Sequence, residues 1–476
     1  MTVQPRRQAG VHVVLADADS EQYQSLRRRP MPREERLRLG RGLRQSVPRS
    51  ALGDWEPFPG RPDPVQLILE SHEGRVDALI PVRVGRMVAS PYGFLRGTAV
   101  VMAADVAHLP STGITPVICG DAHLGNFGFY ASPERDLVID LNDFDEAHPG
   151  RWEWDLRRLV ASIWVAGRGN GHSEDNCRAA TANCVAAYRS EVTRLASEPL
   201  LSRSYQRVDV DRLKESATQP SLRAEIERAA NRARQRTSDR ALPRFTSTIG
   251  GRRRIVEEPP LITRLDEPET DQLAAALDEY LQTLAPHWRR AVGGYTIDDV
   301  AHKVVGVGSV GLRAYVVLLE GSSPDDVVFL QLKQARRSVL ARYVHGDLAW
   351  HAHQGQRVVE YQQALQTVSD PLLGWTTVDG QQYYVRQFRN MKGAVAVDAI
   401  DAAALTDYAG VVGTLLAKAH ARTSGASMIA GYVGLSDRVD VALCRFARAY
   451  ADQTEADHAG LVKAVARGVL PVEHGV

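Results

Sequence analysis

The sequence predicts an α+β fold in which helix-rich segments form a larger part and a β-rich segment forms a smaller part. Apolar residues recur with helical spacing in residues 155–198 and again in residues 405–422. Residues 304–333 contain instead three runs rich in Val and Leu, and glycines separate the first two. At 476 residues the chain is long enough for two or three domains or for one bilobal enzyme with a large buried core.

The composition is that of an ordinary globular protein. Hydrophobic residues make up 44% of the chain and charged residues 24%, with a formal net charge of +1. This balance provides no overall field for nucleic acid or for an anionic membrane. No run is apolar and long enough for a membrane span or a secretion signal, so we expect a cytoplasmic protein without membrane insertion. Nothing in the sequence indicates the oligomeric state.

Cysteine and arginine usage add two expectations. The four cysteines are scattered and form no CxxC pair, so we expect neither a disulfide framework nor a zinc site. Residues 1–50 form an arginine-rich arm, with most of its arginines between positions 27 and 49. Because no aromatic residues interleave with these arginines, a solvated helix and linker is favoured over a nucleic-acid-binding arm.

An acidic motif in the first half of the chain carries most of the functional signal. Cys119-Gly-Asp-Ala-His-Leu-Gly-Asn126 is followed by Leu141-Asn-Asp-Phe-Asp-Glu146, and the runs between them predict a β-hairpin. The hairpin would bring together Asp121, Asn126, Asp143 and Asp145. Phosphoryl transfer needs a carboxylate to orient the attacking hydroxyl and oxygen ligands for Mg²⁺. The alternative, that these are solvated turn formers, is weakened by their joint spacing.

A glycine-rich segment in the second half supplies the complementary features. Gly306, Gly308, Ser309 and Gly311 lie between two β-type runs, and the next run ends in Lys333. No helix opens at the third glycine, which argues against a dinucleotide-binding unit. Glycines allow the backbone to lie close over phosphates, and a lysine can pair with their charge.

These motifs resemble a known group of enzymes. Gly-Asp-x-His-x-x-Asn, a hairpin and Asp-x-Asp look like the catalytic and metal loops of aminoglycoside-phosphotransferase and protein-kinase-like enzymes, in which an Asp-Leu such as Asp155-Leu156 then opens a helix. The sequence pattern over a longer range, including Tyr92-Gly-Phe-Leu-Arg-Gly97 and Trp154-Asp-Leu-Arg-Arg158, resembles the bacterial family called domain of unknown function 2252. That similarity covers about residues 35–455 and names no substrate.

The resemblance implies roles for two further residues. His123 stands in the catalytic loop beside Asp121, where the resembling kinases use a structural histidine; acid–base work or metal binding is its alternative role. A helix is predicted from about Asp347, as N-cap, to Thr367. Kinases hold the strand lysine with a glutamate from such a helix, so Glu360 is the candidate partner of Lys333, against the alternative of a surface glutamate.

The order of the motifs predicts a circularly permuted, protein-kinase-like bilobal fold, because the catalytic loop precedes the glycine loop. Permutation is physically tolerable where chain termini lie close together at the surface. The predicted segments are residues 1–50 as the arm, 51–200 as a large-lobe segment with the catalytic and metal loops, 201–294 as a helical and hairpin insertion, 295–392 as the β-rich small lobe, and 393–476 as a helical large-lobe segment.

The sequence therefore predicts an ATP- and Mg²⁺-dependent phosphotransferase that acts on a hydroxyl of a small molecule or a protein. Asp121 would be the catalytic base or hydroxyl orienter, Asn126 and Asp143 metal ligands, and Asp145 a helper of the metal or of the loop. Two alternatives stay open: adenylyl transfer by the same site, and a nucleotide-binding pseudokinase that acts as a scaffold or sensor. No motif in residues 165–290 identifies the acceptor.

Overall fold

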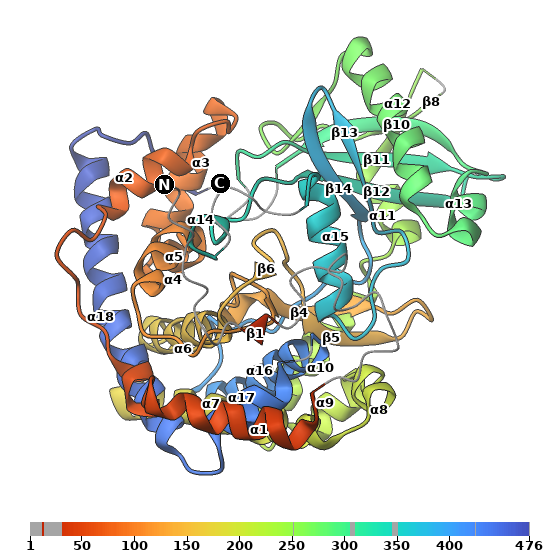
Figure 1. Ribbon diagram of the computed structural model, residues 1–476. Helices are drawn as coiled ribbons and strands as arrows, with labels where there is room; N and C mark the ends of the chain where they lie inside the picture. Colours follow the sequence, from red (N-terminus) through yellow and green to blue (C-terminus); the bar gives the residue numbers. More distant parts are fainter. Residues whose placement is uncertain are drawn as a thin grey trace, which may run out of the picture.

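The computed structural model describes residues 12–13, 31–250, 252–304, 310–344, 351–423 and 425–475. The described chain is a mixed α/β structure in which helices predominate and the larger sheet is antiparallel. Figure 1 shows two parts: a six-stranded sheet with its covering helices at the upper right, and a larger helical part below and to the left.

The six-stranded sheet has the order β13-β14-β12-β11-β10-β9, and every neighbouring pair is antiparallel. Its strands are β9 Ile262–Arg264, β10 Thr296–Lys303, β11 Ala314–Glu320, β12 Val327–Gln334, β13 Gly374–Val378 and β14 Gln381–Gln387. The β-rich nature predicted for residues 304–333 is confirmed, with β10 ending just before this range.

Both faces of this sheet are covered, which explains its continuous apolar runs. In β11, Val316 and Leu318 pack on one side, whereas Val317 and Leu319 pack on the other. The first side is covered by α11 (Ser238–Phe245) and the second by α12 (Glu267–Thr283). Successive strand residues point to opposite faces, so a strand buried on both faces is apolar throughout.

Helix α15 (Gln354–Leu365) lies against β13 and β14, on the side of the sheet that faces the helical part (Figure 1). It is shorter than the predicted helix, whose proposed cap Asp347 falls outside the described residues. The observed N-cap is His353, whose Nδ1 accepts a hydrogen bond from the backbone N–H of Gln356 at 3.2 Å. Gly355 permits the close approach, because a Cβ there would lie 2.2 Å from the Tyr383 carbonyl oxygen.

The helical part has one extensive core. The helices at its centre are α6 Trp152–Gly169, α7 Glu174–Ser197, α16 Ala402–Arg422, α17 Ala426–Val433 and α18 Arg438–Ala466. The helices predicted within residues 155–198 and 405–422 are confirmed. Helices α7 and α16 cross closely: a Cβ on Gly413 would lie 2.2 Å from the Cys184 carbonyl oxygen. All four cysteines are buried free thiols.

Shorter helices precede and follow this core. Those before the acidic motif are α2 Pro64–Ser71, α3 Ile80–Val88, α4 Pro91–Gly97 and α5 Ala99–Ala107. Those after α7 are α8 Leu200–Ser204, α9 Val210–Ser216, α10 Pro220–Arg234, α13 Pro286–Val292 and α14 Ala341–Val344. Residues 201–294 are thus distributed over both parts, since α9 and α10 contact the helical part and α11 to α13 accompany the sheet. No helix within the described ranges has the length and apolar character of a membrane span.

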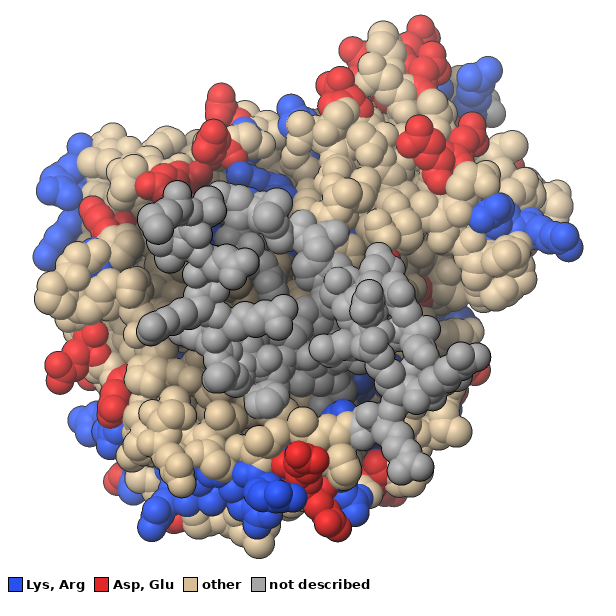
Figure 2. Space-filling view, viewed as in Figure 1, with Lys and Arg blue, Asp and Glu red and all other residues tan. Residues whose placement is uncertain are grey.

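The second half of the arginine-rich arm packs onto the helical part instead of forming a linker. Helix α1 (Arg33–Gly42) lies against α17, where a Cβ on Gly40 would be 2.0 Å from the Met428 carbonyl oxygen. Arg44 and Arg49 then donate to backbone carbonyls at the C-terminal end of α17. Cations at this end of a helix are favoured by its dipole. Figure 2 shows basic side chains gathered along the lower edge and acidic ones at the upper right, over α12.

Candidate functional site

The acidic motif forms two loops at the open end of a hairpin. Strands β4 (Phe127–Ala131) and β5 (Leu137–Leu141) pair antiparallel, which confirms the predicted hairpin. Phe127 lies opposite Leu141, and the N–H of Asn142 donates to the Asn126 carbonyl at 2.9 Å. The pairing therefore brings residues 119–126 and 142–146 side by side, as the site prediction required.

Helix α6 braces the first loop from below. Asp155 accepts hydrogen bonds from the N–H groups of Cys119 and Gly120 at 2.7 and 2.8 Å. Two turns later, Ser162 accepts one from the N–H of Leu124 at 2.8 Å. Residues seven apart are separated by about two turns and lie on one helical face, so both side chains meet the loop. Asp155 thus serves as a buried anchor of the loop backbone, a role that the sequence did not specify.

Asp121 is held by the same face of α6. Arg158 donates to its Oδ1 through Nε at 2.8 Å, and the Asp121 side chain remains 19% exposed. Burial raises the pKa of Asp121, the Arg158 guanidinium opposes this, and Asp143 and Glu146 add to it, so that the pKa is about 7. A carboxyl with a pKa near neutrality can exchange a proton under physiological conditions, as a general base must.

The remaining polar groups of the loop stabilise its shape. The Asn126 side-chain amide donates to the Asp121 carbonyl at 2.7 Å. His123 is 3% exposed, and its Nδ1 accepts a hydrogen bond from the Gly125 N–H at 3.1 Å. Burial lowers the pKa of His123 well below its usual range, and Arg158 adds to this effect. His123 thus provides a hydrogen bond to the backbone of the loop, and its ring does not line the cavity described below.

Lys333 on β12 reaches the second loop. Its Nζ lies 2.9 Å from Asp145 Oδ2, and the two side chains are 6% and 23% exposed. Burial alone would raise the pKa of Asp145, but the Lys333 charge and hydrogen bond outweigh burial and lower the pKa to about 2. The predicted pairing of Lys333 with Glu360 is wrong in this structure, because Glu360 contacts His351 at 2.6 Å and Gln356 at 2.8 Å.

Helix α15 contacts the second loop through a residue that the prediction missed. Arg357, one turn before Glu360, is 1% exposed and donates to the Asp145 and Arg336 carbonyls, both at 2.8 Å, and to the Ala147 carbonyl. It therefore ties the sheet, α15 and the acidic loop together. An arginine among the buried residues of an otherwise apolar helix face was the available signal.

Asp143 faces the cavity, and a carboxylate is the kind of oxygen ligand that Mg²⁺ binds. The Asp143 carbonyl accepts a hydrogen bond from the Cys119 thiol at 3.2 Å, and its Oδ1 accepts one from the Asp145 N–H at 3.4 Å. Within the described ranges, no three His, Cys, Asp or Glu side chains group closely enough to hold a metal by themselves. Mg²⁺ on a polyphosphate needs only one or two carboxylates, with phosphates and waters as further ligands, and the Asp143 carboxylate is available at the cavity for such an ion. Asn126 adjoins Asp121 through its hydrogen bond but does not itself line the cavity.

The glycine-rich segment is only partly described. Gly306, Gly308 and Ser309 lie outside the described residues. Gly311 has a φ of +87°, which favours glycine, and its carbonyl accepts a hydrogen bond from the Val76 N–H at 2.8 Å. The end of this segment is therefore joined to the turn that follows α2.

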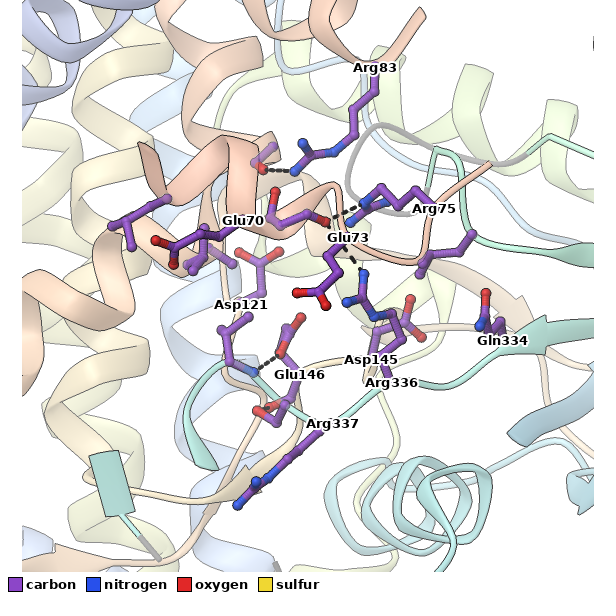
Figure 3. Close-up of a pocket in the computed structure, with 18 of the residues that line it drawn as sticks. Glu70, Glu73, Arg75, Arg83, Asp121, Asp145, Glu146, Gln334, Arg336 and Arg337 are labelled. Carbon is purple, nitrogen blue, oxygen red and sulfur yellow. Dashed lines mark hydrogen bonds between the residues drawn. The ribbon is translucent and has the colours of Figure 1, made fainter. Parts of the chain in front are cut away.

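A cavity of about 590 Å³ lies where these elements meet, and Asp121, Asp143, Asp145 and Glu146 all line it. Figure 3 shows that its other walls carry guanidinium groups from α3, from the turn after α2 and from the segment after β12. These arginines come from distant parts of the chain and are not among the predicted site residues: Arg75, Arg83, Arg96, Arg336, Arg337 and Arg342. Carboxylates next to guanidiniums suit a ligand that has both cationic or hydroxyl groups and anionic groups.

Comparison with known proteins identifies the family. Neither the comparison with curated proteins nor that with solved structures found a match. The family model described as an uncharacterised protein conserved in bacteria matches residues 75–464, a range that contains both acidic loops, Lys333 and most of the residues that line the cavity. Because the match spans most of its length, the chain belongs to this family, domain of unknown function 2252.

Proposed function

We propose that the protein is an ATP- and Mg²⁺-dependent phosphotransferase that acts on a hydroxyl group and has a circularly permuted kinase-like fold. The observation that carries this proposal is the contact of Lys333 with Asp145, 188 positions apart in the chain, beside a cavity lined by Asp121 and Asp143. A phosphate-binding lysine, a metal-binding carboxylate and a base are the groups that phosphoryl transfer requires at one point.

The succession of elements in the β-rich part supports the fold proposal. Strand β10 is followed by the glycine-containing segment, β11, the lysine strand β12, the short helix α14, α15, β13 and β14. In kinases a glycine-rich loop between strands covers the phosphates, and the next strand carries the lysine. The catalytic loop of this chain comes earlier in the sequence, as a permutation of the order requires.

One detail departs from the kinase pattern. Kinases hold the strand lysine with a helix glutamate, whereas Lys333 is held by Asp145 and α15 contributes Arg357 to the same loop. Asp145 therefore orients the lysine in this proposal, and Asp143 keeps the metal role. The Lys333 ammonium has three N–H donors, so it can bind a phosphate oxygen while it stays paired with Asp145.

The proposed chemistry uses each residue once. Asp121 accepts the proton of the acceptor hydroxyl as the hydroxyl oxygen attacks the terminal phosphorus of ATP. The bond from that phosphorus to the bridging oxygen breaks, and ADP leaves. Lys333 pairs with the phosphate charge. Mg²⁺, when bound by Asp143 and Asn126, supplies the neutralising charge on the phosphates. Arg158 keeps the Asp121 carboxylate oriented through its hydrogen bond.

A thermal-shift titration with ATP, with and without Mg²⁺, tests the nucleotide site. Ligand that binds the native state raises the melting temperature by mass action. We expect a Mg²⁺-dependent rise for the wild type that is lost in Lys333→Ala and in Asp143→Ala, each compared with its own melting temperature without ATP. Lys463→Ala, an exposed lysine near the end of α18, is the matched control and should respond like the wild type.

Turnover is then followed by mass spectrometry with candidate hydroxyl acceptors. A product heavier by one phosphoryl group supports the proposal, and a product heavier by an adenylyl group would replace it with nucleotidyl transfer. ATP binding without turnover against a broad acceptor panel would favour a pseudokinase. If ATP with Mg²⁺ causes no shift in the wild type, the proposed nucleotide site is refuted.

A further inference from the structure

Three arginines from separate segments converge on one wall of the cavity. Arg83 extends from α3, Arg75 from the turn after α2, and Arg336 from the segment after β12 (Figure 3). Arg83 is 2% exposed, whereas Arg336 is half-buried. Guanidinium groups are the preferred protein partners of phosphate, because their fork of N–H donors matches its oxygens.

Arg83 is buried without the partners that a buried cation normally has. Its Nη2 donates to the Gly97 carbonyl at 2.9 Å, while Nε and Nη1 have no hydrogen-bond partner among the described residues. No described carboxylate lies within 4.0 Å of its guanidinium. Arginine is almost never fully buried unless it is paired, because an uncompensated charge in the interior is costly.

The neighbouring charges increase this imbalance. Burial lowers the pKa of Arg83 well below its usual range, and Arg75 and Arg336 lower it further. Burial and Arg336 likewise lower the pKa of Arg75 to about 10, although Glu146 and Asp145 oppose this. His72, next to the cluster, has its pKa lowered to about 4 by burial and by Arg83 and Arg75. The side of the cavity around Arg83 is therefore electropositive.

None of the described carboxylates that line the cavity forms an ion pair with Arg83. Glu70 and Glu73 line the cavity, and neither forms an ion pair within 4.0 Å with a described residue. Asp145 is held by Lys333, and a Glu146 carboxylate oxygen accepts the Val339 N–H at 2.7 Å. A multivalent anion would supply the counter-charge and the hydrogen-bond acceptors that Arg83 lacks.

We infer that Arg83, Arg75 and Arg336 form a subsite for a phosphate group in the same cavity as Asp121. The inference deepens the proposed function and rests on it for the identity of the ligand: the phosphate belongs either to an acceptor that is already phosphorylated or to the phosphate chain of the nucleotide. In the first case, the acceptor is a phosphate ester whose hydroxyl is presented to Asp121 while its phosphate binds the arginines.

Isothermal titration with inorganic phosphate at constant ionic strength tests the subsite. We expect saturable binding to the wild type that weakens by at least about tenfold in Arg83→Met and in Arg336→Met. The second variant keeps the test decisive if the first does not fold. Arg157→Met is the matched control, because Arg157 is also a fully buried arginine but does not line the cavity. Its phosphate affinity should equal that of the wild type.

Stability without phosphate gives an independent readout. Arg83→Met removes a buried charge that has no carboxylate partner, so its melting temperature should equal or exceed that of the wild type. Arg157→Met loses hydrogen bonds to the Leu52 and Pro110 carbonyls and a contact with the Phe446 ring, so its melting temperature should fall. Absence of phosphate binding to the wild type at about 10 mM, or equal binding by both cavity variants, overturns the subsite.

A non-hydrolysable ATP analogue with Mg²⁺ separates the two sources of phosphate. Phosphate binding that persists in the presence of saturating analogue assigns the subsite to the acceptor, and loss of phosphate binding assigns it to the nucleotide. If the analogue does not bind at all while phosphate binding still depends on Arg83, the subsite stands and the phosphotransferase proposal fails. If Lys333→Ala loses the analogue but retains phosphate, the two sites are separate.

Discussion

Lys333 and Asp145 should be energetically coupled, and a double-mutant cycle measures the coupling. The atoms Lys333 Nζ and Asp145 Oδ2 are 2.9 Å apart, and the two side chains are 6% and 23% exposed. Burial opposes ionisation of Asp145, but the charge and hydrogen bond of Lys333 lower the pKa from 3.8 to about 2. At about 1.4 kcal/mol per pKa unit, the folded environment favours the ionised carboxylate by about 2–3 kcal/mol.

Lys333→Met leaves the Asp145 carboxylate in a site where burial opposes its charge. Removal of one partner from a buried ion pair costs about 3–5 kcal/mol, and the partial exposure of Asp145 places the expected loss near about 3 kcal/mol. Asp145→Asn leaves the Lys333 ammonium buried, so a similar loss is expected. The double variant, which has neither charge, should be less destabilised than the sum of the single variants by about 2 kcal/mol.

Urea unfolding at pH 7 of the wild type, the two single variants and the double variant provides the free energies of unfolding. These values can be compared if circular dichroism and tryptophan fluorescence give coincident transitions. The folded pKa of Asp145 lies below its unfolded value. The contribution of Asp145 to stability is therefore complete above about pH 3.8 and is lost as the pH falls through about 2. The coupling should thus stay constant between about pH 5 and 8. A coupling below about 0.5 kcal/mol at pH 7 would refute the interpretation of this pair.

Three further predictions concern the site and the helical core. Burial raises the folded pKa of Asp121 to about 7, so its stabilising contribution is complete below 3.8 and is lost as the pH rises through about 7. The free energy of unfolding of the wild type in EDTA should therefore fall by about 2–3 kcal/mol more than that of Asp121→Asn when the pH is raised from 5 to 8. Urea unfolding of both proteins at the two pH values measures this difference, and equal changes would contradict the prediction. Glu360→Gln should keep the Mg²⁺-dependent thermal shift with ATP that Lys333→Ala loses, and loss of the shift would assign Glu360 the lysine-holding role after all. Gly413→Ala should destabilise the protein by about 1–3 kcal/mol in urea unfolding, because its Cβ would meet backbone of α7. Its control, Gly460→Ala in an open part of α18, should stabilise it by about 0.5–1 kcal/mol.

The acidic loops could be predicted from the sequence because their signals are local. Two β-type runs and the turn between them determine a hairpin, and a hairpin places the residues at its two outer ends side by side. Asp121 and Asn126 on one flank therefore had to approach Asp143 on the other, and the pairing of Phe127 with Leu141 has this effect. No information from distant parts of the chain was needed.

The partner of Lys333 could not be predicted in the same way. The sequence placed Glu360 on a helix that follows the lysine strand, but not the rotation of that helix about its axis. Each residue turns an α-helix by about 100°, so the side chain that faces the site depends on the register of packing. In the structure the face that contacts the acidic loop contains Arg357, and Glu360 contacts His351 instead. Only the tertiary packing decides between these two residues.

Arg83 was hidden for a different reason, and that reason bears on function. Its neighbours Val82, Val84 and Met87 are buried, so the local apolar pattern predicts a segment of the core. A single arginine in such a segment gives no sign of its own that it has a function. Burial of a guanidinium is informative only once the structure shows whether a carboxylate compensates it, and for Arg83 no described carboxylate does. Local rules that fail in this way tend to mark functional sites, because a group that costs stability within the chain can be balanced by a ligand. Asp121 in the same cavity is a comparable case with the opposite charge, because burial there opposes the ionisation of its carboxyl group. An arginine that lacks an anion and a carboxylate that holds a proton near neutral pH are together the features expected of a cavity that binds a phosphate and takes a proton from a hydroxyl.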